Sequence, residues 1–401
     1  MKSAFILSLI LFFVASSMVW QAKLRVCSLD AEALQKSKSR LTAKDAALLP
    51  ALDALCGDAD KALKAGPFSV TQKERTPPSG DKHDYLSHAP YWWPDPKSKD
   101  GLPYIRRDGE LFPDSKRGAD GPRIGAMAET VETLAAAYYF AGEERYAERA
   151  ALLLRAWFLD PATKMNPNLR YAQAIPGRND GRGAGLIEGR HFIRIVDSAG
   201  LLEGSRAWTE KNQTALTAWF REFAGWMQTS PNGKDEAKAK NNHGSWYAAQ
   251  LACYALFIGD RELARKTVEG ARARIEWQVE PDGKQPEELK RTRGLWYSGF
   301  NLEALMTLAE AGKKVGVDLY GHQTKDGRGI RRGLDYLAPY ADPARKWPHR
   351  QINEMESARR ELAYLLRRAG AAYREPKYEE LLTKHLSAEA AEQRWQLLWP
   401  N

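Results

Sequence analysis

The sequence has few cysteines. Only Cys27, Cys56 and Cys253 occur in 401 residues, a count that excludes a disulfide-rich scaffold, and no two are spaced as in a zinc knuckle. In an oxidising compartment a Cys27–Cys56 disulfide would tie an N-terminal arm to the first helix, and the sequence leaves that pairing open. Cys253 lies in an apolar helical stretch and is expected in the core.

Long apolar runs are also missing, except at the start of the chain. Residues 4–19 carry no charge and follow a short start that contains Lys2. The run is shorter than the ~20 residues that cross a bilayer comfortably as a helix, and it has the pattern of a secretory signal. We therefore expect a signal peptide at residues 1–22 and a periplasmic or secreted protein. An uncleaved membrane anchor is the alternative.

The sequence also has no recognisable linker and few strand-like patterns. No Ser/Gly/Pro-rich stretch or change of composition divides residues 23–401, so we predict one domain there. Strand-like alternation is sparse, and helical periodicity dominates from residue 126. The segments that begin at 138 and 254 share one order: an apolar helix, a glycine turn and a second helix. Such repeated helical hairpins indicate a fold built from antiparallel helix pairs.

The predicted helices suggest an all-α architecture. They span 44–64, 126–141, 143–158, 188–203, 209–228, 300–314, 328–338, 350–370 and 376–386, with one more after residue 243. Long irregular segments occupy 65–125 and 160–187. Long loops gathered at one rim favour an (α/α) toroid, an incomplete barrel of antiparallel helix pairs, over a solenoid, which would show a tighter period.

The charge balance points to an anionic partner. The formal net charge is +9, and a positive field concentrates and steers polyanions. Nucleic acid is disfavoured because the basic residues are dispersed and no nucleic-acid-binding motif is present. We expect an anionic polysaccharide as the partner of a monomeric protein that is not inserted in the membrane once the signal has been removed.

Aromatic residues gather in one predicted loop. Residues 82–96 contain three prolines, which exclude a continuous helix. Aromatic rings on such a loop can stack on the apolar faces of sugar rings. We interpret four as substrate-binding residues: Tyr85, Tyr91, Trp92 and Trp93. Anchoring of the loop to the barrel is the alternative for the two tryptophans.

A second predicted loop is rich in arginine. Residues 166–192 combine four arginines with Gly and Asn. Because an arginine fork binds a carboxylate through two hydrogen bonds, Arg178 and Arg190 are candidate ligands of uronate sugars. A solvated loop, with Arg190 paired to Glu188, is the alternative.

Two further segments precede apolar helices. In NNHGSWYAAQ (241–250), Asn241 or Asn242 can cap the helix, so that His243 projects from a first turn that favours negative charge. Trp246 follows one turn later, and Asn241 and Trp246 are further candidates for substrate binding. The alternative is an ordinary N-cap beside a packed histidine.

In KRTRGLWYSGFNLEAL (290–305), Arg293 and Tyr297 precede a helix expected to begin near Phe300. They share one face if this stretch is helical. Gly294 and Gly299 oppose a helix there.

In this order, the four segments resemble the alginate lyase family of all-helical polysaccharide lyases, including its glucuronan-cleaving relatives. The resemblance covers roughly residues 65–360 and is carried by NNHGSWY, RTRGLWYSGFNL and the tyrosine-tryptophan-proline loop. It implies a toroid with a deep cleft under a mobile loop. It also implies that Asn242 and His243 neutralise a carboxylate, that Arg293 binds substrate and that Tyr297 is both acid and base. In the best-known members the tyrosine lies seven residues after the arginine, where this chain has Phe300. Tyr297 matches other branches.

The implied reaction is β-elimination on a 4-linked polyuronate. Removal of the C5 proton builds negative charge on the neighbouring carboxylate, which Asn242, His243 and Arg293 would stabilise. Tyr297 would take the proton, and its pKa, ordinarily about 10, would have to be lowered by nearby cations. In mannuronate and glucuronate the C5 hydrogen and O4 lie on the same side, so one phenol can serve both. Guluronate requires a second catalyst, a role open to His243. No metal or organic cofactor is expected.

Two other functions remain open from the sequence. A glycoside hydrolase on the same toroid requires two carboxylic acids that flank the bond. Asp84, Asp180 and Glu188 are available for this but form no recognisable pair. The other alternative is a non-catalytic periplasmic polysaccharide-binding protein.

Overall fold

The computed structural model describes residues 24–352, 355–390 and 393–400. The predicted signal peptide lies outside this range. Within it, no helix is both long and apolar enough to cross a membrane.

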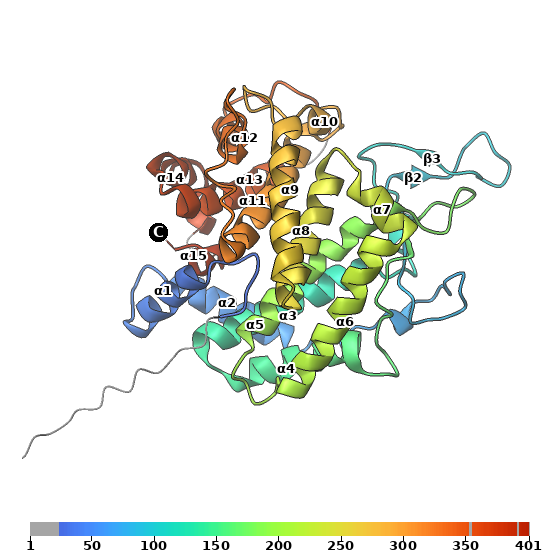
Figure 1. The fold of residues 1–401 in the computed structure, drawn as a ribbon, viewed down its shortest axis with the longest axis horizontal. Helices are drawn as coiled ribbons and strands as arrows, with labels where there is room; N and C mark the ends of the chain where they lie inside the picture. The colour runs from blue at the N-terminus through green and yellow to red at the C-terminus, as the bar shows by residue number, and fades with distance from the viewer. Residues whose placement is uncertain (1–23, 353–354, 391–392, 401) are drawn as a thin grey trace, which may run out of the picture.

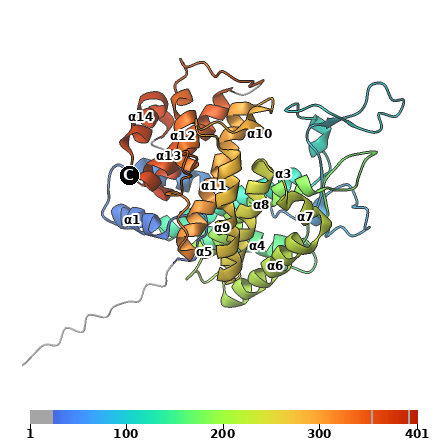
Figure 2. The ribbon, with the colours of Figure 1, turned by 45° about the horizontal axis from the view of Figure 1, so that its top comes forward.

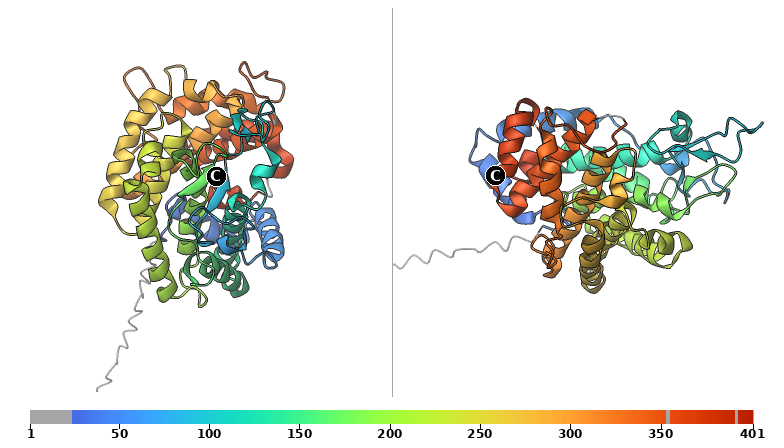
Figure 3. Two further views of the ribbon diagram at one scale, coloured as in Figure 1. Left: turned by 90° about the vertical axis from the view of Figure 1, so that its right-hand side faces the viewer. Right: turned by 90° about the horizontal axis from the view of Figure 1, so that it is seen from above.

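Helices build most of the described chain and follow one another round a ring, as the left view of Figure 3 shows. The ring closes where the first helices meet the last, because α15 contacts both α1 and α2. This confirms the predicted all-α toroid. The α-helices in chain order are α1 (Ala31–Thr42), α2 (Leu49–Ala62), α3 (Gly121–Ala141), α4 (Glu144–Leu154), α5 (His191–Leu201), α6 (Glu210–Thr229), α7 (Pro231–Ala237), α8 (Asn242–Phe257), α9 (Arg261–Gln278), α10 (Pro286–Leu289), α11 (Gly294–Val315), α12 (Ile330–Leu337), α13 (Met355–Tyr373), α14 (Pro376–Ala390) and α15 (Trp395–Leu398).

The two predicted helical hairpins are present as α3–α4 and α8–α9. Gly142 ends α3 in the left-handed conformation, with φ of 77°, which glycine adopts without steric cost. Asp260 caps α9 by accepting a hydrogen bond from the backbone N–H of Leu263. The helices of each hairpin pack against each other, so the internal repeat in the sequence is a structural repeat.

The predicted start of α11 was wrong by nearly two turns. The helix begins at Gly294, not near Phe300. The backbone N–H of Gly294 donates to the carbonyl of Arg350 at 2.9 Å, and most of the first turns are buried. Packing therefore outweighs the roughly 1 kcal/mol that a helical glycine costs relative to alanine. Helices α1, α7, α10 and α15 were not predicted.

Helices α8 and α11 form the inner wall of the ring. Both are buried along almost their whole length, and they pack against each other. Helices with apolar residues on every side are typical of such central positions. Most of the buried hydrophobic residues form one cluster that extends from Val26 to Trp399.

The two long irregular segments meet at one end of the ring, on the right in Figures 1 and 2. β1 (Leu86–His88) pairs in parallel with β4 (Tyr171–Ala174), and β2 (Trp92–Trp93) pairs antiparallel with β3 (Ile105–Arg106). These short pairings hold the predicted rim loops beside the N-terminal end of α8.

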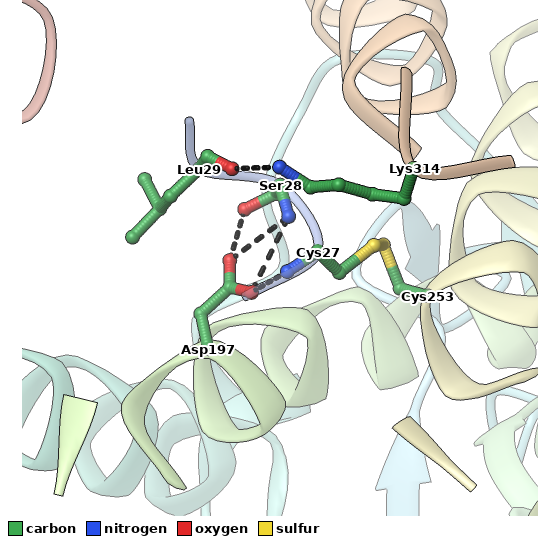
Figure 4. Close-up of a disulfide and its surroundings, with 6 residues drawn as sticks. All are labelled: Cys27, Ser28, Leu29, Asp197, Cys253 and Lys314. Atoms are coloured by element: carbon green, nitrogen blue, oxygen red, sulfur yellow. Dashed lines mark hydrogen bonds between the residues drawn. A yellow bond between two sulfur atoms is a disulfide. The ribbon is translucent and has the colours of Figure 1, made fainter. Parts of the chain in front are cut away.

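The disulfide differs from the pairing considered from the sequence. Cys27 bonds to Cys253 of α8 with a Cα–Cα distance of 5.4 Å, and Cys56 is free (Figure 4). The buried Asp197 of α5 accepts hydrogen bonds from the backbone of Cys27 and from Ser28. Because these contacts hold the arm across α5 and α8, Cys27 lies beside Cys253 and away from Cys56.

Candidate active site

The first turn of α8 is anchored to a buried glutamate. The backbone N–H and the side-chain Nδ2 of Asn242 donate to the two carboxylate oxygens of Glu288, each at 2.6 Å. Burial raises the pKa of Glu288 to about 7, although the hydrogen bonds from Asn242 oppose this. Asn241 is the N-cap, and its side chain accepts from the backbone N–H of His243 at 3.3 Å. The predicted cap is thus present.

His243 is oriented by a second buried carboxylate. Its Nδ1 lies 2.7 Å from Oε1 of Glu236 on α7. A ring nitrogen that faces a carboxylate carries the proton, which leaves the lone pair of the neutral imidazole on Nε2. The side chain of His243 is 21% exposed, whereas Asn242 has no exposed surface. His243 is therefore the member of the pair with access from outside.

Buried amides support this turn from below. Gln278 of α9 donates to the carbonyl of Asn241, while its own oxygen accepts from Ser245 and Asn301. Gly244 has no room for a side chain, because a Cβ there would collide with the Ala239 carbonyl. The N-terminal end of α8 is consequently held in one place.

Arg293 and Tyr297 share the beginning of α11. Arg293 is the N-cap residue, and its carbonyl accepts from the backbone N–H of Tyr297 at 2.9 Å. The two side chains are 7% and 5% exposed. The guanidinium of Arg293 lies 4.6 Å from the ring of Trp296. The stretch is therefore helical, with Arg293 and Tyr297 one turn apart.

The hydroxyl of Tyr297 is held by two neighbours. It accepts from Nη2 of Arg291 at 2.7 Å and donates to the hydroxyl of Tyr91 at 2.9 Å. The Arg291 guanidinium also covers the ring, 3.7 Å from its centroid. Burial and the neighbouring Tyr91 raise the pKa of Tyr297, while Arg291 lowers it. This is opposite to the lowered pKa that the sequence argument required, because burial outweighs the single cation.

A rim-loop aspartate fixes Arg291. Asp108 accepts from Nε of Arg291 at 3.0 Å and from Nη2 at 2.7 Å, and it also accepts from the backbone N–H of Thr292. Burial opposes ionisation of Asp108, but these bonds hold its pKa well below its usual range. Gly109 follows with φ of +79° and packs against Thr292 and Arg293, where a Cβ would not fit. These contacts hold the rim loop that contains Asp108 and Gly109 against the start of α11.

The predicted aromatic residues of the rim separate into different environments. Tyr91 reaches Tyr297, and Trp92 lies under the guanidinium of Arg178, 5.0 Å from its ring centroid. Trp93 donates from Nε1 to the carbonyl of Glu110 and contacts Phe112, as an anchor of the loop would.

Tyr85 and Arg178 make contacts within the protein. Tyr85 has no exposed surface and donates to Glu188 at 2.7 Å. This corrects the reading of Tyr85 as a sugar-stacking residue, because a ring buried on all sides cannot contact a substrate. Arg178 donates from Nε to the carbonyl of Tyr104 and so joins the two rim loops.

Arg190 and Trp246 line a cavity inside the ring. Phe300, which stands where the best-known family members have tyrosine, lines it as well. The Phe300 ring lies 5.1 Å from that of Trp246 and 5.3 Å from the Arg190 guanidinium. Arg190 donates to the Ile187 carbonyl, and Glu188 accepts from Tyr85 and Ser87. The pairing of Arg190 with Glu188 that was considered from the sequence is therefore not formed as a direct contact.

Sequence reasoning missed the residues that hold the site together. These are Asp108, Glu236, Glu288 and Arg291, to which Gln173 can be added. Gln173 is buried, has a φ of 53° and accepts from Arg182; such a backbone conformation in a residue other than glycine often marks a functional site. Of these residues only Arg291 could have been identified from the sequence, because it lies two residues before Arg293. Acidic residues are too common in the sequence for Glu236 or Glu288 to stand out.

The carboxylic acids considered for a hydrolase do not form a catalytic pair. Glu188 accepts from Tyr85 and Ser87. Asp84 is buried and accepts from Ser79 and Asn166. Asp180 is exposed on the rim loop. Two of the three acids are thus engaged in structural hydrogen bonds.

Comparison with known proteins identifies the class. The family model described as alginate lyase matches residues 69–347. The chain belongs to the alginate lyase family and is a polysaccharide lyase.

Solved structures agree with this assignment. An alginate lyase from Bacteroides ovatus is 42% identical, with a TM-score of 0.89 over 94% of this chain and 99% of that one. The alginate lyase A1-III from Sphingomonas species A1 is 16% identical, with a TM-score of 0.54 over 95% and 98% of the two chains, and shares the fold. No curated protein matches this chain significantly.

Proposed function

We propose that the protein cleaves a 4-linked polyuronate, mannuronate-rich alginate or glucuronan, by β-elimination. The observation that supports this most is the grouping of charged and polar side chains at the N-terminal ends of α8 and α11, where the Tyr297 hydroxyl lies between Arg291 and Tyr91. The similarity to the Bacteroides ovatus protein, whose structure is described as an alginate lyase, favours alginate.

His243 and Arg293 bind the carboxylate of the sugar that loses its C5 proton, and Asn242, which has no exposed surface, supports them from beneath with its amide dipole. The Asn242 amide has two N–H groups, and Glu288 receives one of them. His243 and Arg293 supply a hydrogen bond and a positive charge. These donors stabilise the negative charge that grows on the carboxylate as the proton leaves, and their fixed positions remove the cost of reorienting them.

Tyr297 transfers the proton. Since its pKa is raised, the phenol is protonated at neutral pH and must lose its proton before it acts as a base. Its hydrogen bond to Tyr91 offers a path for that proton, and Arg291 stabilises the phenolate. After accepting the C5 proton, the same group donates it to the departing O4.

This geometry favours mannuronate and glucuronate. One phenol on one face suffices when the C5 hydrogen and O4 are on the same side of the ring. Guluronate would use His243 from the opposite face, where its Nε2 carries the lone pair because Nδ1 faces Glu236.

We also propose that residues 1–22 are a signal peptide and that the mature chain acts as a monomer of one domain in the periplasm or outside the cell. The Cys27–Cys253 disulfide supports this location, because such bonds persist in oxidising compartments.

An ultraviolet assay for the unsaturated product tests the proposal. Polymannuronate, polyguluronate, glucuronan, hyaluronan and heparin-like chains are compared, with His243→Ala and Tyr297→Phe as variants. Turnover of polymannuronate or glucuronan by the wild type and its loss in Tyr297→Phe are expected. Full activity of Tyr297→Phe would refute the chemistry, and a saturated product would indicate a hydrolase.

A further inference from the structure

A cavity of about 440 Å³ lies inside the ring, between α3, α5, α8, α11 and α13. Its volume is within the ~300–1,000 Å³ of small-molecule sites. Trp296 is part of its wall, and the Trp296 ring lies 4.9 Å from the ring of Tyr297 and 4.6 Å from the Arg293 guanidinium. The cavity therefore begins one side chain away from the proposed catalytic groups.

The lining of the cavity carries an excess of positive charge. Five arginines and three glutamates contribute to it. Glu132 lies 3.5 Å from both Arg194 and Arg394, so one carboxylate serves two guanidinium groups. An anion that enters this space is attracted by the remaining positive charge.

Arg368 indicates which anion fits. Its side chain is 3% exposed and lines the cavity, yet Nε and Nη2 have no hydrogen-bond partner among the residues that the structure describes. Its faces are covered, since Tyr364 and Trp399 lie 5.6 and 5.2 Å from the guanidinium carbon. Buried N–H groups without an acceptor are costly. Two adjacent N–H groups of a guanidinium match the two oxygens of a carboxylate.

The rest of the lining suits a sugar ring. Trp246 and Phe300 offer aromatic surface for the apolar face of a sugar, and Glu303 and Glu361 offer acceptors for hydroxyl groups. A small inorganic anion would use only the arginines, whereas a sugar acid uses all three kinds of group.

We propose that this cavity is a subsite for the uronate chain, in which Arg368 binds the carboxylate of a sugar beyond those held at Tyr297, with Arg190 at the end nearer Tyr297. This inference rests on the proposed lyase function. It implies that the enzyme recognises its substrate by length as well as by the sugars at the cleaved bond.

Cleavage of oligomannuronates of increasing length, from the disaccharide to the octasaccharide, tests the subsite. For the wild type, kcat/KM is expected to rise when the chain becomes long enough to enter the cavity. In Arg368→Gln that rise should be smaller by roughly tenfold or more, the scale of one charged hydrogen bond, and Arg368→Lys should recover part of it.

The matched control is Arg221→Gln, which changes an exposed arginine on α6 and should behave as the wild type does. Thermal unfolding checks that each variant is folded, and Arg190→Gln serves the same test if Arg368→Gln does not fold.

The outcomes separate the inference from the function on which it rests. Absence of unsaturated product from every uronate polymer with the wild type would overturn the proposed function. An active wild type whose length dependence is unchanged in both Arg368→Gln and Arg190→Gln would overturn the subsite alone.

Discussion

The two ends of the inner helices are held in different ways. At the N-terminal ends of α8 and α11, carboxylates hold the site residues: the buried Glu288 holds Asn242, the buried Glu236 holds His243, and the partly buried Asp108 holds Arg291. At the other end the Cys27–Cys253 disulfide ties the N-terminal arm to α8, and Lys314 of α11 donates to the carbonyl of Leu29 (Figure 4).

The difference shows how one scaffold separates function from stability. Charged hydrogen bonds orient donors closely and respond to pH, which suits a site that moves protons. A disulfide neither orients donors nor responds to pH in this way, but it restricts the conformations of the unfolded chain. Changes at the first end should therefore alter catalysis, and changes at the second should alter stability.

The largest effect is expected for Tyr297→Phe. Removal of the hydroxyl abolishes proton transfer at C5 and O4, and kcat should fall by about 10³-fold or more. KM for polymannuronate should change little, because the carboxylate ligands remain. A parallel loss of thermal stability would mean that the hydroxyl serves mainly the Arg291–Tyr91 contact.

Glu288→Gln should have the next largest effect. The amide presents a donor to one of the two Asn242 N–H groups, so Asn242 loses its orientation and kcat/KM should fall by about 10²-fold. The matched control Glu287→Gln, on the same short helix but with a side chain that is 45% exposed, should keep wild-type activity.

The same glutamate predicts a pH dependence. With its pKa raised to about 7, Glu288 accepts both hydrogen bonds above that pH and loses one acceptor when protonated below it, so wild-type activity should decline as the pH falls through about 7. Because the folded pKa exceeds the ordinary value of 4.5, ionised Glu288 costs stability as the pH rises between these values. A pH–rate profile of Glu288→Gln should lack this acidic limb. If the limb persists, another group is responsible.

Arg291→Gln sharpens the role of the cation at Tyr297. Arg291 lowers the pKa of the phenol, so its removal should raise that pKa further, reduce kcat about tenfold at neutral pH and move the alkaline rise of the rate to higher pH. Arg291→Lys keeps the charge without the paired bonds to Asp108, so its kcat and its pH profile should lie between those of the wild type and of Arg291→Gln. An unshifted pH profile in Arg291→Gln would leave Arg291 with a packing role.

The smallest effect on turnover is expected at the end of the inner helices that carries the disulfide. The double variant Cys27→Ser, Cys253→Ser opens a loop of 226 residues and should lower the free energy of unfolding by about 3–5 kcal/mol. At temperatures where it is folded, kcat should remain within about twofold of wild type, since the loss concerns the unfolded chain. Cys56→Ser, at the free cysteine, is the control. A large loss of kcat would show that the arm positions the active site.

Much of the fold was predictable from local patterns. The helices α3, α4, α6 and α8 follow from apolar periodicity and from caps such as Asn241 and Gly142. The start of α11 was not predictable, because Gly294 and Gly299 disfavour a helix in an isolated chain. Burial of the first turns outweighs this cost in the folded protein. The short α7 and α10 carry too few turns for periodicity to show.

The candidate site was predictable only in part. Its motifs NNHGSWY and RTRGLWYSGFNL revealed the residues on the helices. The partners of these residues come from elsewhere in the chain: Glu288 lies 46 positions from Asn242, and Tyr91 lies 206 positions from Tyr297. Tyr85 was assigned to substrate binding because composition does not report the burial of one ring among several.

The helical class, the order of the helix pairs and the segments in which the chemistry lies follow from the amino-acid sequence alone. Each depends on side chains a few positions apart, as helical periodicity and capping do. The tertiary structure alone decided that Cys27 meets Cys253, that Asp108 fixes Arg291 and that burial raises the pKa of Tyr297. These depend on which helices and loops pack together, because burial and pairing are properties of neighbours in space.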